Sequence, residues 1–184
     1  MKKFFLFTIL TIFFLVSCHV KTNTETTGAI NDCETSRVRS EIEAVLKRTM
    51  ECNFKKDINC FMQSFDSLFV LESPESVTKT RTITKDSLQK DIQRDWSIIS
   101  KIFEVERWID SIYVSSPDSA IVFTNQFYHR TFLKPNGQPG EDDVVTTQKH
   151  RETWIRSGSG WKQQRIRELG GAIYVNGKPY TEGQ

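Results

Sequence analysis

Two residues on one strand-like segment have the types and spacing of an acid–base couple. His150 and Glu152 lie two positions apart in the alternating segment 144–156, so both side chains project from the same face of a strand. A carboxylate beside an imidazole raises the pKa of the histidine and itself stays ionised, which would permit proton transfer. A row of His, Glu and Gln on a strand is also typical of a solvated face with cross-strand charge pairs. Both interpretations stay open.

A second polar pair, Asn125 and His129, lies in the segment 119–133. The face that carries this pair also holds Ile121, Phe123, Phe127, Thr131 and Leu133, and it is the more apolar of the two faces. We therefore expect it to point toward the core and a pocket. Two polar groups inside an apolar cavity would orient a ligand. The alternative is a buried pair that only bonds neighbours or water.

Tryptophans complete the candidate site, because an aromatic ring either lines a pocket for a flat apolar ligand or fills a core. The pocket candidates are Trp96, Asn125, His129, His150, Glu152 and Trp154.

The other face of the segment 119–133 is also rather apolar, with Val122, Tyr128 and Phe132. Apolar residues on both faces of a sheet suggest a contact with another subunit, so we expect a homodimer through the sheet.

The N-terminal residues predict export. Lys2 and Lys3 precede an apolar run from Phe4 to Val16, as in a secretory signal peptide, and the run is shorter than the roughly 20 residues that span a bilayer. Leu15-Val16-Ser17-Cys18 resembles the bacterial lipobox. The resemblance implies that Cys18 is lipidated and that the protein lies in the bacterial cell envelope, periplasmic or surface-facing. An ordinary signal peptide is the alternative.

Composition limits the partners. Of the 25 lysines and arginines, loss of Lys2 and Lys3 with the signal leaves 23, which equals the 23 aspartates and glutamates. This balance gives no indication of nucleic-acid binding or of a polybasic membrane patch. The three histidines are scattered and no Cys-x-x-Cys pair occurs, so we expect no metal site and no cofactor. Cys52 and Cys60 flank a predicted helical corner, and the sequence leaves open whether they form a disulfide.

The chain divides into three parts: a signal at 1–17, a flexible tether at 18–33 rich in Thr and Asn, and one domain at 34–184. The domain begins with helices. An amphipathic helix over about 34–55 places five apolar residues at spacings of three and four, namely Val38, Ile42, Val45, Leu46 and Met50. A short helix with Phe61, Met62 and Phe65 follows.

A short strand at 66–73 is expected to stop at Pro74, and a polar loop leads to Thr84, a helix N-cap. The helix after it places Leu88, Ile92, Trp96 and Ile99 on one face. Long strands follow at 104–114, 119–133, 144–156 and 161–169, joined by hairpin turns, and Asn176-Gly177 predicts a last small hairpin. Helices followed by a strand meander indicate an α+β fold with helices on one face of a curved antiparallel sheet.

This pattern resembles nuclear transport factor 2-like domains. The opening resemblance is carried by the amphipathic helix, Asp57 at the corner, Phe61, Phe65-Asp66 and the strand ending at Pro74. The closing residues, Trp154-Ile155-Arg156, Gly158-Ser159-Gly160 and Trp161-Lys162, look like the last hairpin of the SnoaL-like branch. The resemblance implies a cone-shaped curved antiparallel sheet, N-terminal helices on its concave face and an apolar pocket inside.

Within this superfamily, the ketosteroid isomerase branch has an aspartate base just before the strand-ending proline and a tyrosine eight residues before the corner Asp. Here those positions hold Ser73 and Thr49. Serine is not a useful base near neutral pH, and loss of an oxyanion-hole donor costs roughly 10²–10³ in rate. We therefore expect a lipid-anchored protein that binds a small apolar ligand or a protein partner without catalysis. The alternative is a polyketide-cyclase- or isomerase-like enzyme with a His or acidic residue in the cone.

Overall fold

The computed structural model describes residues 32–76, 79–158 and 160–180. Its elements are α1 (Asp32–Phe54), α2 (Ile58–Met62), β1 (Phe65–Ser76), β2 (Lys79–Thr84), α3 (Lys85–Ile98), β3 (Ile99–Ser116), β4 (Ser119–Leu133), β5 (Pro139–Ser157), β6 (Gly160–Val175) and β7 (Lys178–Pro179). The proposed signal, Cys18 and most of the tether lie outside the described residues. Helix α1 begins inside the predicted tether, at Asp32.

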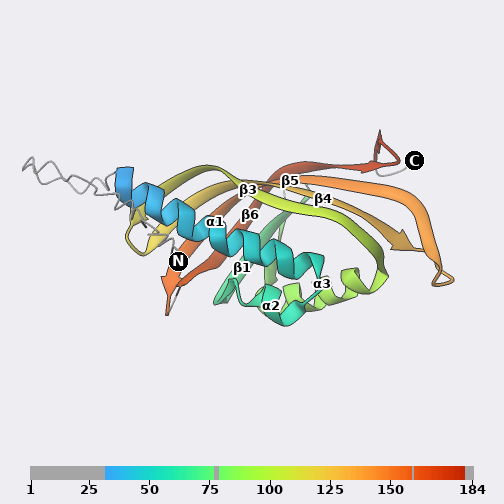
Figure 1. Cartoon of the computed structure of the whole chain (residues 1–184), viewed down its shortest axis with the longest axis horizontal. Coiled ribbons are helices and arrows are strands. Elements are labelled where there is room, and N and C mark those ends of the chain that lie inside the picture. Colours follow the sequence, from blue (N-terminus) through green and yellow to red (C-terminus); the bar gives the residue numbers. More distant parts are fainter. Residues whose placement is uncertain (1–31, 77–78, 159, 181–184) are drawn as a thin grey trace, which may run out of the picture.

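Seven strands form one curved sheet in the order β2-β1-β6-β5-β4-β3, with β7 paired to β6. The three helices gather on one side of this sheet (Figure 1), which is the predicted α+β arrangement. One detail of the prediction is wrong: β1 pairs with β6 in parallel, so the sheet is mixed rather than wholly antiparallel. It is also not closed, because β2 and β3 are its edges.

Helix α1 lies on the concave face because its apolar stripe is buried there. Val38, Ile42 and Leu46 pack with Trp154 and Trp161 of the sheet into one core cluster. A second cluster joins the end of α1 with α2, α3 and β1 through Met50, Phe61, Phe65, Phe69 and Trp96, among others. The face of α1 that carries Val38, Ile42 and Leu46 is therefore filled with side chains, and the cavity described below lies beside the second cluster.

Local signals position the helices as expected. Asp57 caps α2, since its carboxylate accepts a hydrogen bond from the Cys60 backbone N–H at 3.0 Å. Thr84 caps α3 through its side-chain oxygen, which accepts from Ser87 N. Cys52 and Cys60 form a disulfide, with their Cα atoms 5.6 Å apart, and this bond ties the end of α1 to α2. The corner that leads into the cone is thus fixed by a cap and a covalent link.

Two expectations about β1 and β2 are wrong. β1 continues past Pro74 to Ser76, because β6 pairs with β1 only up to Glu72 and the missing N–H of the proline is not needed there. The segment before Thr84 is not a loop but the edge strand β2, paired with β1 from Val70 to Ser76. Its alternating threonines and charged residues are those of an exposed edge strand, which resembles a loop in composition.

The long strands match the predicted meander, with β3, β5 and β6 longer than expected. The final hairpin is confirmed: Asn176 and Gly177 have φ of 53° and 76°, as a type I′ turn requires, and β7 returns to pair with Tyr174 and Val175. The edge strand β3 has four register irregularities against β4, which leave Ser100, Phe103, Asp110 and Ser115 as extra residues on β3.

Candidate functional site

The candidate site is a cavity of about 480 Å³ between the concave face of the sheet and α3, here called the cone cavity. Its apolar wall comes from the three helices, β1, the start of β3, the end of β4 and β6, and consists of Met50, Phe61, Phe65, Phe69, Leu71, Leu88, Ile92, Trp96, Ile98, Ile99, Phe132 and Ile166. Its polar lining comes mostly from β3, β4, β5 and β6: Arg107, Gln126, Tyr128, Arg130, Thr146, Gln148, His150 and Glu168, together with Asn53 and Asp95 from the helices. A volume of this size suits a small organic ligand.

Strand β4 presents the opposite face to the one expected. Ala120, Val122 and Thr124 are buried against α1, and Gln126, Tyr128 and Arg130 continue the same face into the cone cavity. Asn125 and His129 therefore lie on the convex face, and their assignment to the pocket is wrong. The inner face of β4 carries Thr124, Gln126 and Arg130, because a cavity accepts polar side chains that a packed core would exclude. The inner face is therefore not the more apolar of the two faces of β4. Val122, Tyr128 and Phe132 likewise point inward and do not form an outer surface.

On the convex face, His129 is engaged by neighbours. Its Nε2 contacts the Asp143 carboxylate, and its ring stacks on Phe103 with centroids 4.6 Å apart. Asn125 is paired in register with Trp108 of β3 and Lys149 of β5. Neither residue belongs to the cone cavity.

The face of β5 that carries His150 and Glu152 points inward, so the solvated-face interpretation is wrong. His150 is buried and lines the cone cavity. Glu152 and Trp154 are fully buried beneath the cavity, where Trp154 packs against α1. Trp96 lines the cavity from α3, with its ring 5.6 Å from that of Phe61 in an edge contact. Of the six candidates, two therefore line the cavity, two lie under it and two lie on the other face.

Glu152 is the centre of a buried polar cluster. Its Oε1 accepts from Arg107 Nη2 at 2.6 Å and from the Thr124 hydroxyl. Its Oε2 accepts from Trp154 Nε1 at 2.7 Å and from Gln163 Nε2 at 2.6 Å. Four donors occupy both oxygens of the carboxylate, so Glu152 serves as a buried acceptor for its neighbours.

His150 is held neutral above this cluster. Burial, with the adjacent Arg107 charge, lowers its pKa to about 3. Its Nδ1 lies 3.4 Å from Arg107 Nη2, and because a guanidinium only donates, this nitrogen is the acceptor and Nε2 carries the proton. The partner of Glu152 is thus Arg107, not His150, and the predicted acid–base couple does not form.

Residues not singled out from the sequence dominate the rest of the lining. Gln126 Nε2 donates to Gln148 Oε1 at 3.3 Å, Gln148 Nε2 donates to Glu168 Oε1 at 3.4 Å, and the Ser73 hydroxyl donates to Glu168 Oε2. These hydrogen bonds link four neighbouring strands and place the Glu168 carboxylate in the cavity beside Ser73. Within the described ranges, no group of three or more His, Cys, Asp or Glu side chains is arranged to hold a metal ion.

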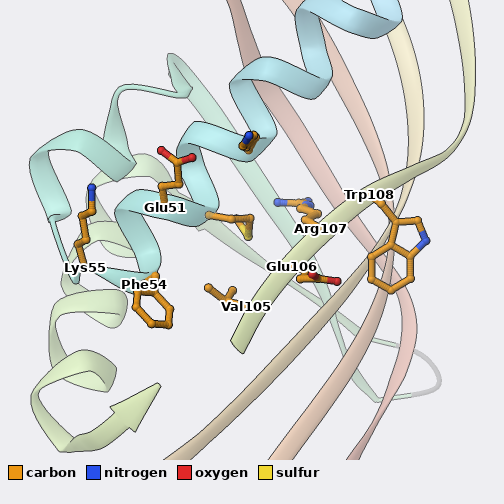
Figure 2. Close-up of a pocket in the computed structure, with 9 residues that line it drawn as sticks. Glu51, Phe54, Lys55, Val105, Glu106, Arg107 and Trp108 are labelled. Carbon is orange, nitrogen blue, oxygen red and sulfur yellow. The ribbon is translucent and has the colours of Figure 1, made fainter. Parts of the chain in front are cut away.

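A second hollow, the side groove, lies between α1 and the edge strand β3 and has a volume of about 540 Å³. Figure 2 shows Glu51 and Phe54 of α1, with Lys55 just after it, on one side, and the β3 residues from Val105 to Trp108 on the other. Met50 and Arg107 line both hollows, so the two adjoin. Five of the nine residues that line the side groove are charged, namely Lys47, Glu51, Lys55, Glu106 and Arg107.

Comparisons with solved structures identify the fold. A putative scytalone dehydratase from Novosphingobium aromaticivorans has a TM-score of 0.63 at 12% identity, over 83% of this chain and 97% of that one. A nuclear transport factor 2-like protein of unknown function from Shewanella oneidensis has a TM-score of 0.53 at 17% identity, over 70% and 96%. The chain has the nuclear transport factor 2-like fold.

A third protein of this fold, a ketosteroid isomerase-like protein from Erwinia carotovora atroseptica, has a TM-score of 0.51 at 17% identity, over 72% of this chain and 96% of that one. No family model matches the sequence, and no curated protein does. The nuclear transport factor 2-like fold carries enzymes as well as proteins of unknown function, so the site alone must indicate the activity. None of the helices in the described ranges is long and apolar enough to cross a membrane.

Proposed function

We propose that this protein is an exported, lipid-anchored binding protein whose cone cavity takes a small, largely apolar ligand. The observation that carries the proposal is the cavity itself: about 480 Å³, aromatic on one side and lined by a few convergent polar groups on the other. Pockets of this kind bind small molecules, with the apolar wall giving affinity and the polar groups giving orientation.

The absence of an available proton carrier at the predicted positions favours binding over catalysis. A general base works best with a pKa near the operating pH, whereas the pKa of His150 is lowered to about 3. Glu152 accepts four hydrogen bonds beneath the floor and does not reach a ligand. The two groups therefore serve as fixed lining and support.

Native mass spectrometry of the purified full chain tests the binding proposal. We expect co-purified small molecules, released on denaturation, or uptake of an added apolar aromatic probe at one molecule per chain. Leu88→Trp, which fills the cavity from α3, should abolish retention and uptake, whereas Leu68→Trp at an exposed position of β1 should not. Equal uptake by both variants would contradict the proposal.

The anchoring proposal depends on Cys18 and has its own test. If Cys18 carries the lipid, Cys18→Ser releases the protein from the membrane fraction, because a polypeptide with balanced charge has no other strong membrane attraction. Continued sedimentation of the variant with membranes would contradict lipid anchoring and leave the cavity proposal unaffected.

Glu168 favours a second candidate function, an isomerase-like or cyclase-like proton transfer. Ser73 occupies the position where the ketosteroid isomerase resemblance expects a base, and its hydroxyl donates to Glu168, which lines the cavity from the next strand. The Glu168 carboxylate of β6 thus lies beside Ser73 of β1, the position at which the resemblance expects a base. Deuterium exchange at the carbon next to a ligand carbonyl, lost in Glu168→Gln, would support this function; no exchange by the wild type would contradict it.

We also propose a homodimer through the convex face of the sheet. Ile121, Phe123 and Phe127 are only half-buried there, and no helix covers them in the described part of the chain. Phe123→Lys should convert a dimer to a monomer in native mass spectrometry, because a charge would be placed in an apolar contact. A monomeric wild type would contradict the dimer.

A further inference from the structure

Arg130 is a cation inside the cone cavity that forms no salt bridge in the described part of the chain, although the Asp95 charge on the same lining acts on it. Its guanidinium carbon lies 4.3 Å from the centre of the Tyr128 ring and 5.2 Å from that of Phe132. Its one hydrogen bond is long, 3.5 Å from Nη1 to the Tyr128 carbonyl. Burial lowers the pKa of Arg130 from its ordinary value, as expected for a charge without full compensation.

Apart from the long Nη1 contact with the Tyr128 carbonyl, no hydrogen bond from this guanidinium is found in the described part of the chain. Aromatic side chains stack on the face of a guanidinium, whereas its N–H groups lie in the plane and point outward. The outward N–H groups form a fork that fits the two oxygens of a carboxylate. Arg130 is therefore prepared for a bidentate contact that the described chain does not supply.

Unpartnered oxygens lie on the same lining. Tyr128 and Thr146 are paired in register on β4 and β5; the Thr146 hydroxyl is buried without a hydrogen-bond partner, and the Tyr128 hydroxyl has only Trp96 beside it. Asn53 Oδ1, on a side chain 93% removed from solvent, lacks a partner too. Burial raises the pKa of Tyr128 to about 12, so its phenol remains a donor at neutral pH. Buried polar atoms are nearly always hydrogen-bonded, so the Thr146 hydroxyl points to a ligand that offers it an acceptor oxygen.

We propose that the cone cavity binds an aromatic or cyclic monocarboxylate, with its carboxylate on Arg130 and its ring system against Phe61, Phe69 and Trp96. This inference rests on the proposed function, in which the cavity is a binding site. A single negative charge fits the lining: Arg107 is already paired with Glu152, and Asp95 and Glu168 face the same cavity. A dianionic phosphate would bring a second negative charge that no other unpaired cation of this lining balances.

The test compares two probes of nearly the same shape, 2-naphthoate and the neutral 2-naphthamide, titrated into the full chain by isothermal calorimetry. We expect 2-naphthoate to bind at least about tenfold more tightly than 2-naphthamide, since hydrogen bonds between ions are roughly twice as strong as neutral ones. Arg130→Met should remove this preference by weakening only 2-naphthoate. Arg167→Met, an exposed arginine beside the lining residue Ile166 on β6, should leave the preference unchanged.

Equal affinities of the two probes for the wild type would overturn the carboxylate proposal while the binding function stands. Absence of binding by either probe, with no co-purified ligand, would overturn both. The wild-type comparison does not depend on how well Arg130→Met folds. Arg130→Lys provides a second variant, because it retains the charge and loses the fork, and it should bind 2-naphthoate more tightly than Arg130→Met does.

Discussion

Arg107 of β3 and Glu152 of β5 form a buried ion pair, with Nη2 and Oε1 2.6 Å apart, across the strand that separates them. The Arg107 side chain is 5% exposed and that of Glu152 is fully buried. Glu152 therefore lies under the floor of the cone cavity, and its ion pair holds Arg107 in the polar lining. A buried pair of this kind is costly to break on one side only, since the remaining charge stays uncompensated.

Arg107→Met should lower the free energy of unfolding by about 3–5 kcal/mol, because Glu152 keeps its neutral donors but loses its counter-charge. The double variant Arg107→Met/Glu152→Gln should be more stable than the single variant, since the amide oxygen still accepts hydrogen bonds from the groups around it. Urea denaturation measures both variants. Strictly additive losses would mean that the two side chains do not interact energetically.

His150 predicts a loss of stability in mild acid. Its pKa is about 3 in the folded chain, against the ordinary 6.5 expected for the unfolded chain. Between pH 6.5 and pH 3, His150 therefore takes up a proton in the unfolded state but not in the folded state. The contribution of His150 to the free energy of unfolding is complete above pH 6.5 and is lost as the pH falls toward 3. The unfolding free energy should fall by up to about 1.4 kcal/mol per pH unit in this window.

Urea denaturation between about pH 7 and pH 5 measures this slope, above the range in which most carboxylates titrate. His150→Gln, which does not titrate, should flatten it. An unchanged slope in the variant would show that another group is responsible.

The cap at Asp57 should be measurable on its own. Asp57→Ala removes the acceptor for the Cys60 N–H and should cost about 1 kcal/mol, whereas Asp57→Asn retains a cap and should cost less. Thermal unfolding of the two variants gives the comparison. Equal melting temperatures for wild type and Asp57→Ala would mean that the corner does not depend on the cap.

The disulfide between Cys52 and Cys60 should stabilise the same corner. The two cysteines are eight positions apart, and closing a loop of this size is worth about 2–3 kcal/mol in the chain-entropy account. Cys52→Ser/Cys60→Ser should unfold at lower urea concentration than the oxidised wild type. A double variant as stable as the oxidised protein would contradict a stabilising role.

Local features were predictable because they depend on neighbours in the chain. The stripe from Val38 to Met50, the caps at Asp57 and Thr84, and the Asn176-Gly177 turn follow from short-range spacing, and the structure confirms each of them. The disulfide was only permitted by the sequence, since spacing does not establish that two Cβ atoms meet.

The orientation of β4 was not predictable from composition. A packed core selects apolar residues, but a cavity also accepts Thr124, Gln126 and Arg130, so the inner face resembles a surface. The parallel contact of β1 with β6 joins residues at least 95 positions apart, such as Val70 and Arg165, and no local pattern encodes it. Arg107, Arg130 and Glu168 became candidates only when these long-range pairings placed them on one lining.

The irregularities of β3 bear on how the edge of the sheet meets other chains. An 18-residue strand at the edge of a sheet would normally offer a long row of unpaired N–H and C=O groups to a second chain, and with it a template for aggregation. The extra residues at Ser100, Phe103, Asp110 and Ser115 interrupt that row at four points and increase its local twist. Deleting Asp110 would join two regular stretches of β3 into a longer, flatter edge. We therefore expect the variant that lacks Asp110 to aggregate through this edge.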